Sequence, residues 1–305
     1  MALFTTLLLL AAALAIPGLI ARTRARLAGR RGIRFAQHLY DARLLLRKGA
    51  VYSTTTSALF RTAPSVYLGA ALVAALFIPV GDLRPVLSFD GDLVAFAYTL
   101  ALGRFVLILA AMDTGSPFEG MGASREALYG ALVEPGLLLA TATLALVSGY
   151  TSFARIFAAD ATGDIQLAVV LLLTAYVFVR ILFTESGRVP VDDPRTHLEL
   201  TMIHEVMCLD YAGVDLAMIK IAGWLKSAAL AMLAADAVAA PLGGRWWIAA
   251  PLSVVMAGIP IGVVESTQAR NKLVRNTTFI LIIAAMAALV FFAAYLLRHN
   301  IIVLE

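Results

Sequence analysis

The chain has 305 residues, of which 61% are hydrophobic and only 14% are charged. Soluble globular domains carry about 25% charged residues, so this composition excludes that class. The formal net charge of +4 gives no reason to invoke nucleic acid. The single cysteine, Cys208, excludes an internal disulfide and an iron–sulfur site built from four cysteines of this chain.

A helix needs about 20 apolar residues to cross the hydrocarbon core of a bilayer. Eight runs have roughly this character: 2–21, 65–81, 92–112, 127–150, 165–184, 215–240, 246–264 and 277–297. The run 65–81 is short, and the run 215–240 contains two lysines. Because the connections leave no room for a soluble domain, we expect an all-α integral membrane protein. Residues 1–305 would form a single membrane domain with about eight transmembrane helices.

The first run has small residues that could be cleaved as in a signal peptide, but its basic residues follow the apolar stretch instead of preceding it. We therefore expect an uncleaved first helix. Lysine and arginine gather in cytoplasmic loops. The connections after the odd-numbered spans, 22–64, 113–126, 185–214 and 265–276, hold sixteen of them, and those after the even-numbered spans, with the C-terminal tail, hold four. This asymmetry predicts cytoplasmic odd-numbered connections and both termini outside.

The basic connection 22–64 contains an amphipathic pattern over 35–48. Phe35, Leu39, Ala42 and Leu46 recur at helical spacing on one face. The pattern predicts a helix on the membrane surface between spans 1 and 2. It leaves open whether this helix faces lipid or is a docking platform for a soluble partner.

The connection 185–215 holds seven of the twenty carboxylates of the chain. Two prolines interrupt its first part. From Thr196 onward the pattern favours a helix, with Thr196 as N-cap and Glu199 as its capping-box partner. A charge run is ordinarily a solvated loop, but here leucine, methionine and valine alternate with the acids. We expect this segment to fold back onto the membrane domain.

Ionisable side chains within spans are costly and are candidates for function. Arg180 and Lys220 are placed where they can extend to the interface. Four others cannot be explained in this way: Arg104, Glu134, Lys226 and Asp236. Buried acids beside basic partners suit a proton relay, and a structural ion pair between helices is the alternative.

His204 to Cys208, HEVMC, has the spacing of two zinc ligands on one helical turn. A tetrahedral site needs at least one further protein ligand, and His197 is the only histidine nearby in the sequence. We therefore expect no metal site in this chain.

Four stretches carry a family resemblance: RKGAVYSTTTSALFRTAP at 47–64, DTGSPFEGMGASREALYGALVEP at 113–135, ESGRVPVDDPRTHLELTMIHEVMCLDYAG at 185–213, and VESTQARNKL at 264–273. They resemble the membrane-anchor subunit of group 4 membrane-bound nickel–iron hydrogenases, of the formate hydrogenlyase and hydrogenase-4 type, which is similar to subunit 1 (H) of respiratory complex I. The complex I pattern is matched directly at Glu185, Arg188, Pro190, Asp192, Glu199, Leu200, Tyr211, Ala212 and Gly213.

Two departures from the complex I pattern are visible. The run between Leu200 and Tyr211 is three residues longer and is typical of the hydrogenase branch, with Asp210 where complex I has glutamate. After Arg275 the sequence NTTF replaces an expected proline-containing continuation, which concerns only the start of the last span.

The resemblance implies a bacterial inner-membrane subunit that is not itself catalytic. Its acidic loop would line a funnel facing the catalytic subunits and lead carboxylates toward Glu134. The implied ion path comprises Glu134, Glu185, Asp192, Glu199, Glu205, Asp210, Arg104, Lys226 and Asp236. The implied docking or funnel residues, with 22–64 and 185–215 as the docking face, are Arg188, Tyr211, Arg47, Lys48, Arg61, Arg125 and Glu265.

The implied partners are hydrogenase large and small subunits, an iron–sulfur electron-transfer subunit and an antiporter-like membrane subunit. We expect the nickel–iron centre and the iron–sulfur clusters on those partners and no cofactor on this chain. The expected function is to anchor the redox module and to couple its electron transfer to proton or sodium movement. Three alternatives stay open: subunit 1 (H) of a complex I with a quinone funnel, a free-standing transporter, and a passive anchor whose buried charges are structural.

Overall fold

The computed structural model describes residues 2–158, 162, 164–193 and 202–299. Within them, eight helices are long and apolar enough to cross a membrane. They are α1 (Ala2–Leu27), α3 (Ala58–Leu76), α4 (Asp92–Asp113), α5 (Pro117–Ser148), α7 (Ile165–Glu185), α8 (Gly213–Ala239), α9 (Trp246–Thr267) and α10 (Leu273–Arg298). The expected all-α membrane fold with eight spans is confirmed.

Two spans begin earlier than the apolar runs predict. α3 starts at Ala58 because the Ser57 hydroxyl caps it, accepting from Leu59 N at 3.1 Å, while the Ser57 N–H donates to Asp113 at 2.7 Å. α5 starts at Pro117, so its 32 residues measure about 48 Å and extend beyond a bilayer core. Its first three turns are too polar to be recognised as a span from hydropathy alone.

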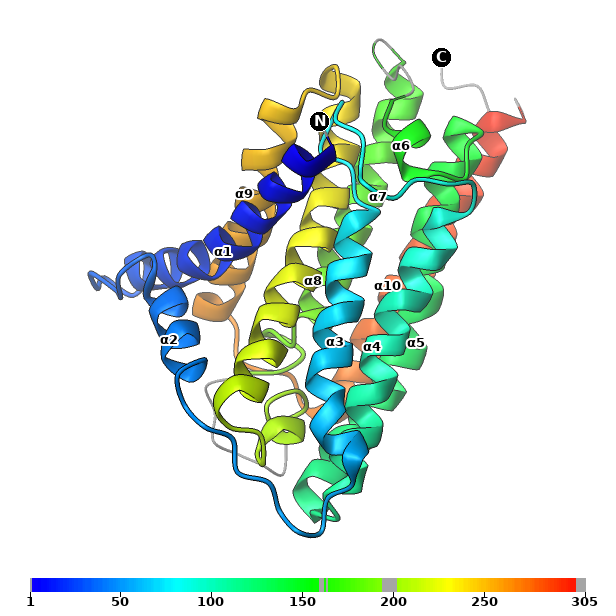
Figure 1. Cartoon of the computed structure of the whole chain (residues 1–305). Coiled ribbons are helices and arrows are strands. Elements are labelled where there is room, and N and C mark those ends of the chain that lie inside the picture. The colour runs from blue at the N-terminus through cyan, green and yellow to red at the C-terminus, as the bar shows by residue number, and fades with distance from the viewer. Residues whose placement is uncertain (1, 159–161, 163, 194–201, 300–305) are drawn as a thin grey trace.

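α8 is the most buried span and lies against α1, α3, α7 and α9. Its central residues from Ala228 to Ala235 are all buried and are mostly alanine, which lets the neighbouring helices approach closely. α5 packs on α4, α7 and α10, and α1 packs on α9. Figure 1 shows the resulting bundle, with α8 at its centre and α1 and α9 crossing at one side.

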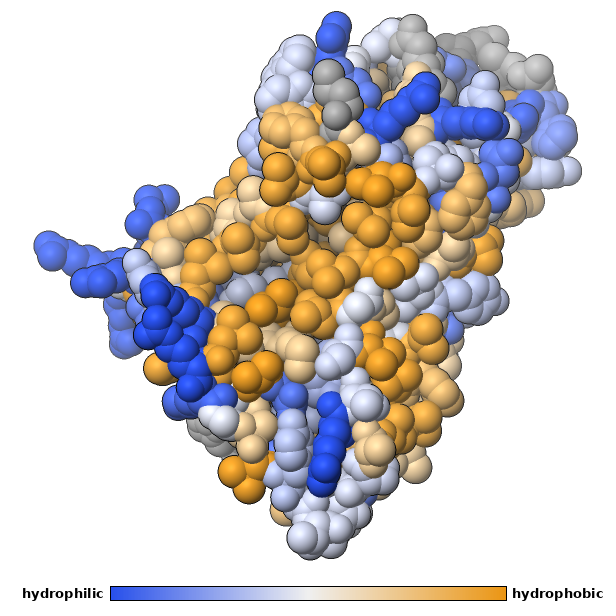
Figure 2. Space-filling model, in the orientation of Figure 1, coloured by the Kyte–Doolittle hydropathy of each residue, from blue (hydrophilic) through white to orange (hydrophobic). Residues whose placement is uncertain are grey.

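The bundle has two distinct ends. α1 begins and α10 ends at one of them, which we call the terminal end (Figure 1). The other, called here the α2 end, carries the short helix α2 (Gln37–Leu45) and the segment 186–212 that joins α7 to α8. In Figure 2 an apolar band lies between polar surfaces at the two ends, as expected for a multi-pass membrane protein.

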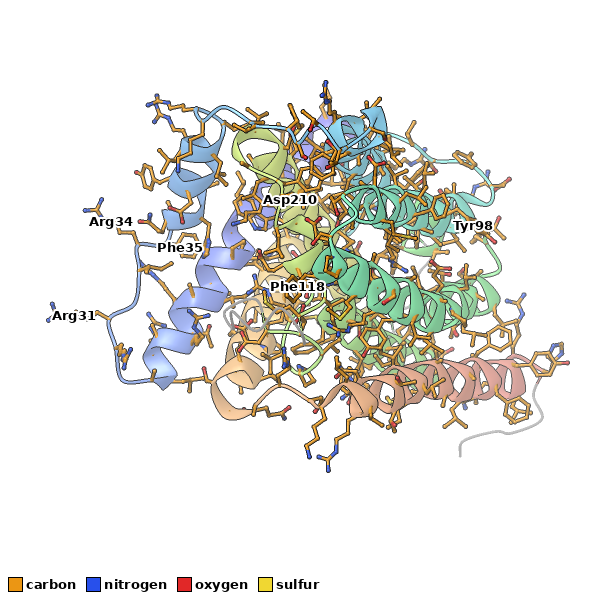
Figure 3. The ribbon with its side chains drawn as sticks, turned by 90° about the horizontal axis from the view of Figure 1, so that it is seen from below. Arg31, Arg34, Phe35, Tyr98, Phe118 and Asp210 are labelled. Atoms are coloured by element: carbon orange, nitrogen blue, oxygen red, sulfur yellow. The ribbon has the colours of Figure 1, made fainter. Side chains whose placement is uncertain are left out.

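The amphipathic helix predicted over 35–48 is present in shortened form as α2. Ala42 is buried and the ring of His38 lies edge-on to Trp224 of α8, with centroids 6.4 Å apart. Leu46 is exposed because it follows the end of the helix. Before α2, Arg31 and Arg34 point away from the bundle, as Figure 3 shows from below.

The helix predicted from Thr196 is a correction for the part that is described. Thr196 and Glu199 lie outside the described residues, and 202–212 forms a loop with one short 3-10 turn, η1 (Val206–Cys208). The buried Asp192 carboxylate accepts from the backbone N–H groups of Ile203 and His204, at 3.0 and 3.1 Å, and this fixes an irregular path. The segment still folds back as expected, since Met202, Ile203, Val206 and Met207 are buried.

Candidate functional site: a buried charge cluster

Arg104 of α4 is the centre of a buried group of charges. Its Nη1 lies 3.1 Å from Oε1 of Glu134, its Nε lies 3.6 Å from Oε1 of Glu126, and its Nη2 is paired with Glu185. The guanidinium therefore faces three carboxylates from α5 and α7 at once. Removing these groups from water is costly, and only mutual pairing makes it tolerable.

The spacing of residues along α5 explains how it supplies two of these carboxylates. Glu126, Gly130 and Glu134 are four residues apart, so they lie on one face of the helix. Gly130 has no side chain, and the guanidinium occupies the space that a Cβ would need. The local sequence E-x3-G-x3-E thus creates a slot with a carboxylate on either side.

A second cation completes the cluster from α8. Lys226 Nζ lies 3.1 Å from Oε2 of Glu185, and it sits 6.0 Å from the ring centroid of Tyr67 on α3. Lys226 is buried, and so is Glu185 between the two cations. We call Arg104, Glu126, Glu134, Glu185 and Lys226 the charge cluster.

A cavity of about 140 Å³ leads toward the cluster from the α2 end. Its lining comes from α3, α4, α7, α8 and the segment 186–212, and it runs from the buried Glu185 to the exposed Lys220. Its polar lining residues are Tyr67, Glu185, Ser186, Arg188, His204, Glu205, Cys208, Lys220 and Ser227. Burial raises the pKa of the Cys208 thiol, which therefore stays neutral.

The charges in the cluster do not balance when every group is ionised, because three carboxylates face two fixed cations. A buried excess of one negative charge favours binding of one proton. The arrangement can therefore hold a proton among several carboxylates and pass it between them.

Two residues of the sequence-predicted ion path lie apart from this cluster. Asp192 holds the backbone of the 186–212 segment through the hydrogen bonds described above. Asp236 lies ten residues beyond Lys226 on α8, about 15 Å along the helix, where Oδ1 accepts from Gly81 N at 2.8 Å. Both contacts are those of residues that fix turns.

Of the remaining ion-path residues, Glu205 lines the cavity and Asp210 is exposed at the α2 end. The Asp210 N–H donates to Glu119 of α5 at 3.1 Å. Figure 3 places Asp210 and Phe118, the neighbour of Glu119, near the middle of this end of the bundle. Asp210 thus belongs to the surface around the cavity and not to the buried cluster.

The predicted docking residues form three sets of contacts. The buried Glu265 carboxylate of α9 pairs with Arg24 of α1 and with Arg188, each at 3.2 Å. The Arg125 guanidinium donates to the Met202 carbonyl at 2.9 Å. The Tyr211 hydroxyl donates to the Phe60 carbonyl at 2.9 Å and its ring stacks on Phe60. These contacts attach the 186–212 segment to α1, α3, α5 and α9.

The last three docking candidates lie around the connection from α2 to α3. Arg47 and Lys48 are exposed after α2. The Arg61 guanidinium lies 5.1 Å from the ring centroid of Tyr52, whose hydroxyl donates to Asp215 at 2.7 Å. This hydrogen bond raises the pKa of Tyr52, and burial raises the pKa of Tyr211, so both phenols stay neutral.

Sequence reasoning misses three residues of the site: Glu126, Tyr67 and His204. Hydropathy leaves Glu126 in a loop because the apolar run begins at 127. Its distance of eight residues from Glu134 is the available signal. Tyr67 carries no signal in the sequence, and the spacing around His204 suggests only a metal ligand. Among the described residues, no group of three histidine, cysteine or carboxylate side chains could hold a metal ion.

Eight spans around a buried charge cluster define the chain as a multi-pass membrane protein. It belongs to the NADHdh family, described as NADH dehydrogenase, whose family model matches residues 1–299. The chain is 37% identical to hydrogenase-4 component C of Escherichia coli, over 71% of its own length and 67% of that protein. It is 34% identical to formate hydrogenlyase subunit 4 of the same organism, over 72% and 70% of the two chains.

More distant relatives extend the comparison. One NADH-quinone oxidoreductase subunit of Orientia tsutsugamushi, that designated H, is 27% identical over 60% of this chain and 52% of that protein. The fold is similar to a chain of the membrane-bound sulfane sulfur reductase, an archaeal respiratory membrane complex, with a TM-score of 0.74, 22% identity and coverage of 95% of this chain and 98% of that one. Relatives of this kind are subunits of multi-subunit respiratory membrane complexes, and this chain is accordingly a subunit of a larger assembly.

Proposed function

We propose that this chain is the membrane subunit of an energy-converting nickel–iron hydrogenase complex of the formate hydrogenlyase type. It anchors a cytoplasmic redox module at the α2 end and couples electron transfer in that module to proton or sodium movement. The nickel–iron centre and the iron–sulfur clusters belong to the partner subunits. The relatives with the greatest similarity reported above are components of hydrogenase-4 and formate hydrogenlyase, and this supports the hydrogenase assignment.

The observation that carries the coupling role is the charge cluster with its excess carboxylate. The cavity reaches Glu185 from the α2 end, and Arg104 links Glu185 to Glu126 and Glu134. A passive anchor has no need for three carboxylates around a buried guanidinium, since apolar residues of similar volume are equally stabilising or better. A charge change at a partner's redox centre can move a proton along such a row.

Glu134 marks the far side of the proposed path. Its side chain is 40% exposed and lines a pocket of about 40 Å³ with Tyr98, which lies at the edge of the bundle in Figure 3. A carboxylate facing lipid at this depth is costly. We propose that an antiporter-like membrane subunit covers this face of α4 and α5 and receives the ion there.

The α2 end offers the docking face for soluble partners. The chain from 22 to 48 carries nine basic residues and one acid, and 186–212 is attached by the contacts described above. Hydrogenase large and small subunits and an iron–sulfur subunit would cover both. We place this end in the cytoplasm, at the bacterial inner membrane, because the basic residues accumulate there.

The size of the cavity separates the proposal from a quinone-binding subunit of complex I. About 140 Å³ is well below the roughly 300–1,000 Å³ of typical small-molecule sites. The volume fits a few waters and thus proton entry. A free-standing transporter would be stable alone after extraction, whereas the proposed subunit should be recovered with its partners when it carries an affinity tag.

The decisive experiment replaces Glu126 by glutamine in the assembled complex. This change keeps the volume but removes one proton-binding site. In proteoliposomes containing a pH-sensitive dye, hydrogen turnover should persist while coupled proton movement falls sharply; a sodium-coupled complex would lose ²²Na⁺ uptake instead. Glu119→Gln is the matched control, because Glu119 is also a buried carboxylate of α5 but lies outside the cluster. Wild-type coupling and assembly in Glu126→Gln would overturn the proposal.

A further inference from the structure

His204 stands between the cavity and the charge cluster. It lines the cavity from the 186–212 segment, and its Nδ1 lies 3.5 Å from Oε2 of Glu126. Glu126 is the cluster carboxylate that is held least closely by Arg104. The imidazole is therefore the first protonatable ring that a proton meets on the way from the cavity to Glu126.

The backbone of His204 is fixed while its ring is not. The main-chain N–H donates to the buried Asp192 carboxylate at 3.1 Å. Both ring nitrogens are buried and have no hydrogen-bond partner among the described residues. Buried polar atoms are normally satisfied, so two unused ring nitrogens beside a cavity indicate partners that come and go, namely water and a proton.

Gly187 makes the position of the ring possible. A Cβ at Gly187 would lie 2.8 Å from Nδ1 and 2.9 Å from Cγ of His204, and the backbone there has a φ of +57°. Both the space and the left-handed backbone require glycine. The turn after α7 is thus shaped to hold the imidazole next to the end of that helix, where Glu185 lies.

The charged and titratable groups around the ring come from every neighbouring element. They are Tyr67 on α3, Arg104 on α4, Glu126 on α5, Glu185 on α7, Lys220 and Lys226 on α8, and Arg188, Glu205 and Cys208 on the 186–212 segment. Within the cluster, three carboxylates face two cations. A protonated His204 would bring that sum to zero, and a neutral one leaves an excess negative charge.

From this geometry we infer that His204 is the proton-accepting residue at the entrance of the ion path and delivers protons to Glu126; the inference rests on the proposed coupling function. The ring takes a proton from cavity water at Nε2 and becomes an imidazolium. The Nδ1–H bond then breaks as a bond forms to Oε2 of Glu126. One proton has moved from water to the carboxylate, and the ring is neutral again and returns to its starting tautomer by exchange with water.

The test compares two histidines at the same end of the molecule. His204→Gln keeps polarity and approximate size but cannot carry a proton. In proteoliposomes of the whole complex, coupled proton movement should fall by about tenfold or more, with hydrogen turnover assayed under uncoupled conditions largely retained. The control is His38→Gln: the His38 ring contacts Trp224 outside the cluster, and burial together with the charge of Arg188 lowers its pKa, so it is already neutral. This control should couple like the wild type.

Chemical rescue separates proton delivery from a structural role. In His204→Ala, added imidazole should restore coupled proton movement, and pyrazole, a ring of the same size but a much weaker base, should not. Equal rescue by both rings, or normal coupling in His204→Gln, would overturn the inference. If Glu126→Gln abolishes coupling while His204→Gln does not, only the histidine role fails. If neither substitution affects coupling, the proposed function fails with it.

Discussion

The guanidinium of Arg104 lies directly against Gly130. A Cβ on Gly130 would lie 2.3 Å from Nη1 and 2.8 Å from Cδ of Arg104. Arg104 cannot withdraw without leaving the carboxylates of α5 and α7 that surround it. A single glycine therefore decides whether the charge cluster can form.

We expect Gly130→Ala to disrupt the cluster and to destabilise the protein by about 1–3 kcal/mol, as overpacking does. The measurement is the thermal unfolding midpoint of the purified complex, together with its coupled ion movement. Gly120→Ala is the control on the same helix, because a Cβ there meets nothing within 4 Å. Alanine is the better helix former, so this control should be neutral or slightly stabilising. Equal behaviour of the two variants would contradict the packing described here.

Arg104→Leu should be more damaging than the loss of any one carboxylate. Without the guanidinium, Glu126 and Glu185 stay buried with less compensation, and breaking a buried pair costs about 3–5 kcal/mol. We expect failed assembly or a large fall in the unfolding midpoint. The double variant Arg104→Leu/Glu126→Gln should recover part of the loss, since Glu185 keeps Lys226 as its partner. A double variant no better than the single one would show that Glu126 is not electrostatically coupled to Arg104.

The eight spans are predictable from the sequence because apolar length is the direct requirement of the bilayer. The start of α5 is not, since the polar turns before residue 127 are helical for reasons that hydropathy does not record. This is why Glu126 escapes sequence reasoning although Glu134 and Arg104 do not. The pairing itself depends on how α4 and α5 are rotated toward each other, and this rotation follows from Gly130 only once both helices are placed.

The segment 186–212 shows the opposite limit. Its alternating apolar residues correctly predict that it folds back, but a helical pattern there is overridden by the Asp192 carboxylate, which binds backbone N–H groups eleven and twelve residues ahead. Asp236 resembles an ion-path residue because it lies in a span. Its contact with Gly81 becomes visible only when the turn before α4 is placed beside α8.

The orientation in the membrane can be tested with single cysteines. Arg30 is exposed at the α2 end, and Arg84 is exposed between α3 and α4 at the terminal end. In a Cys208→Ser background, Arg84→Cys should react in intact cells with a thiol reagent that does not cross membranes. Arg30→Cys should react only after the membrane is permeabilised. The reverse pattern would place the basic residues outside and would overturn the proposed cytoplasmic docking face.

Glu265 should prove to be the residue that fixes the docking face. Its side chain is fully buried and pairs with Arg24 and Arg188, so one carboxylate joins α1, α9 and the 186–212 segment. Glutamine cannot compensate the charge of either arginine, and we expect Glu265→Gln to cost about 1–3 kcal/mol.

The comparison for Glu265 is Asp90→Asn. Asp90 pairs with Arg155 at 3.1 Å, but both side chains are more than half exposed, so this change should stay within about 1 kcal/mol. Thermal unfolding of the purified complex measures both variants. In Glu265→Gln the soluble partners should also dissociate at lower salt, because the 186–212 segment loses one of its anchors. An unfolding midpoint and partner retention equal to those of Asp90→Asn would mean that the three elements are held together without this carboxylate.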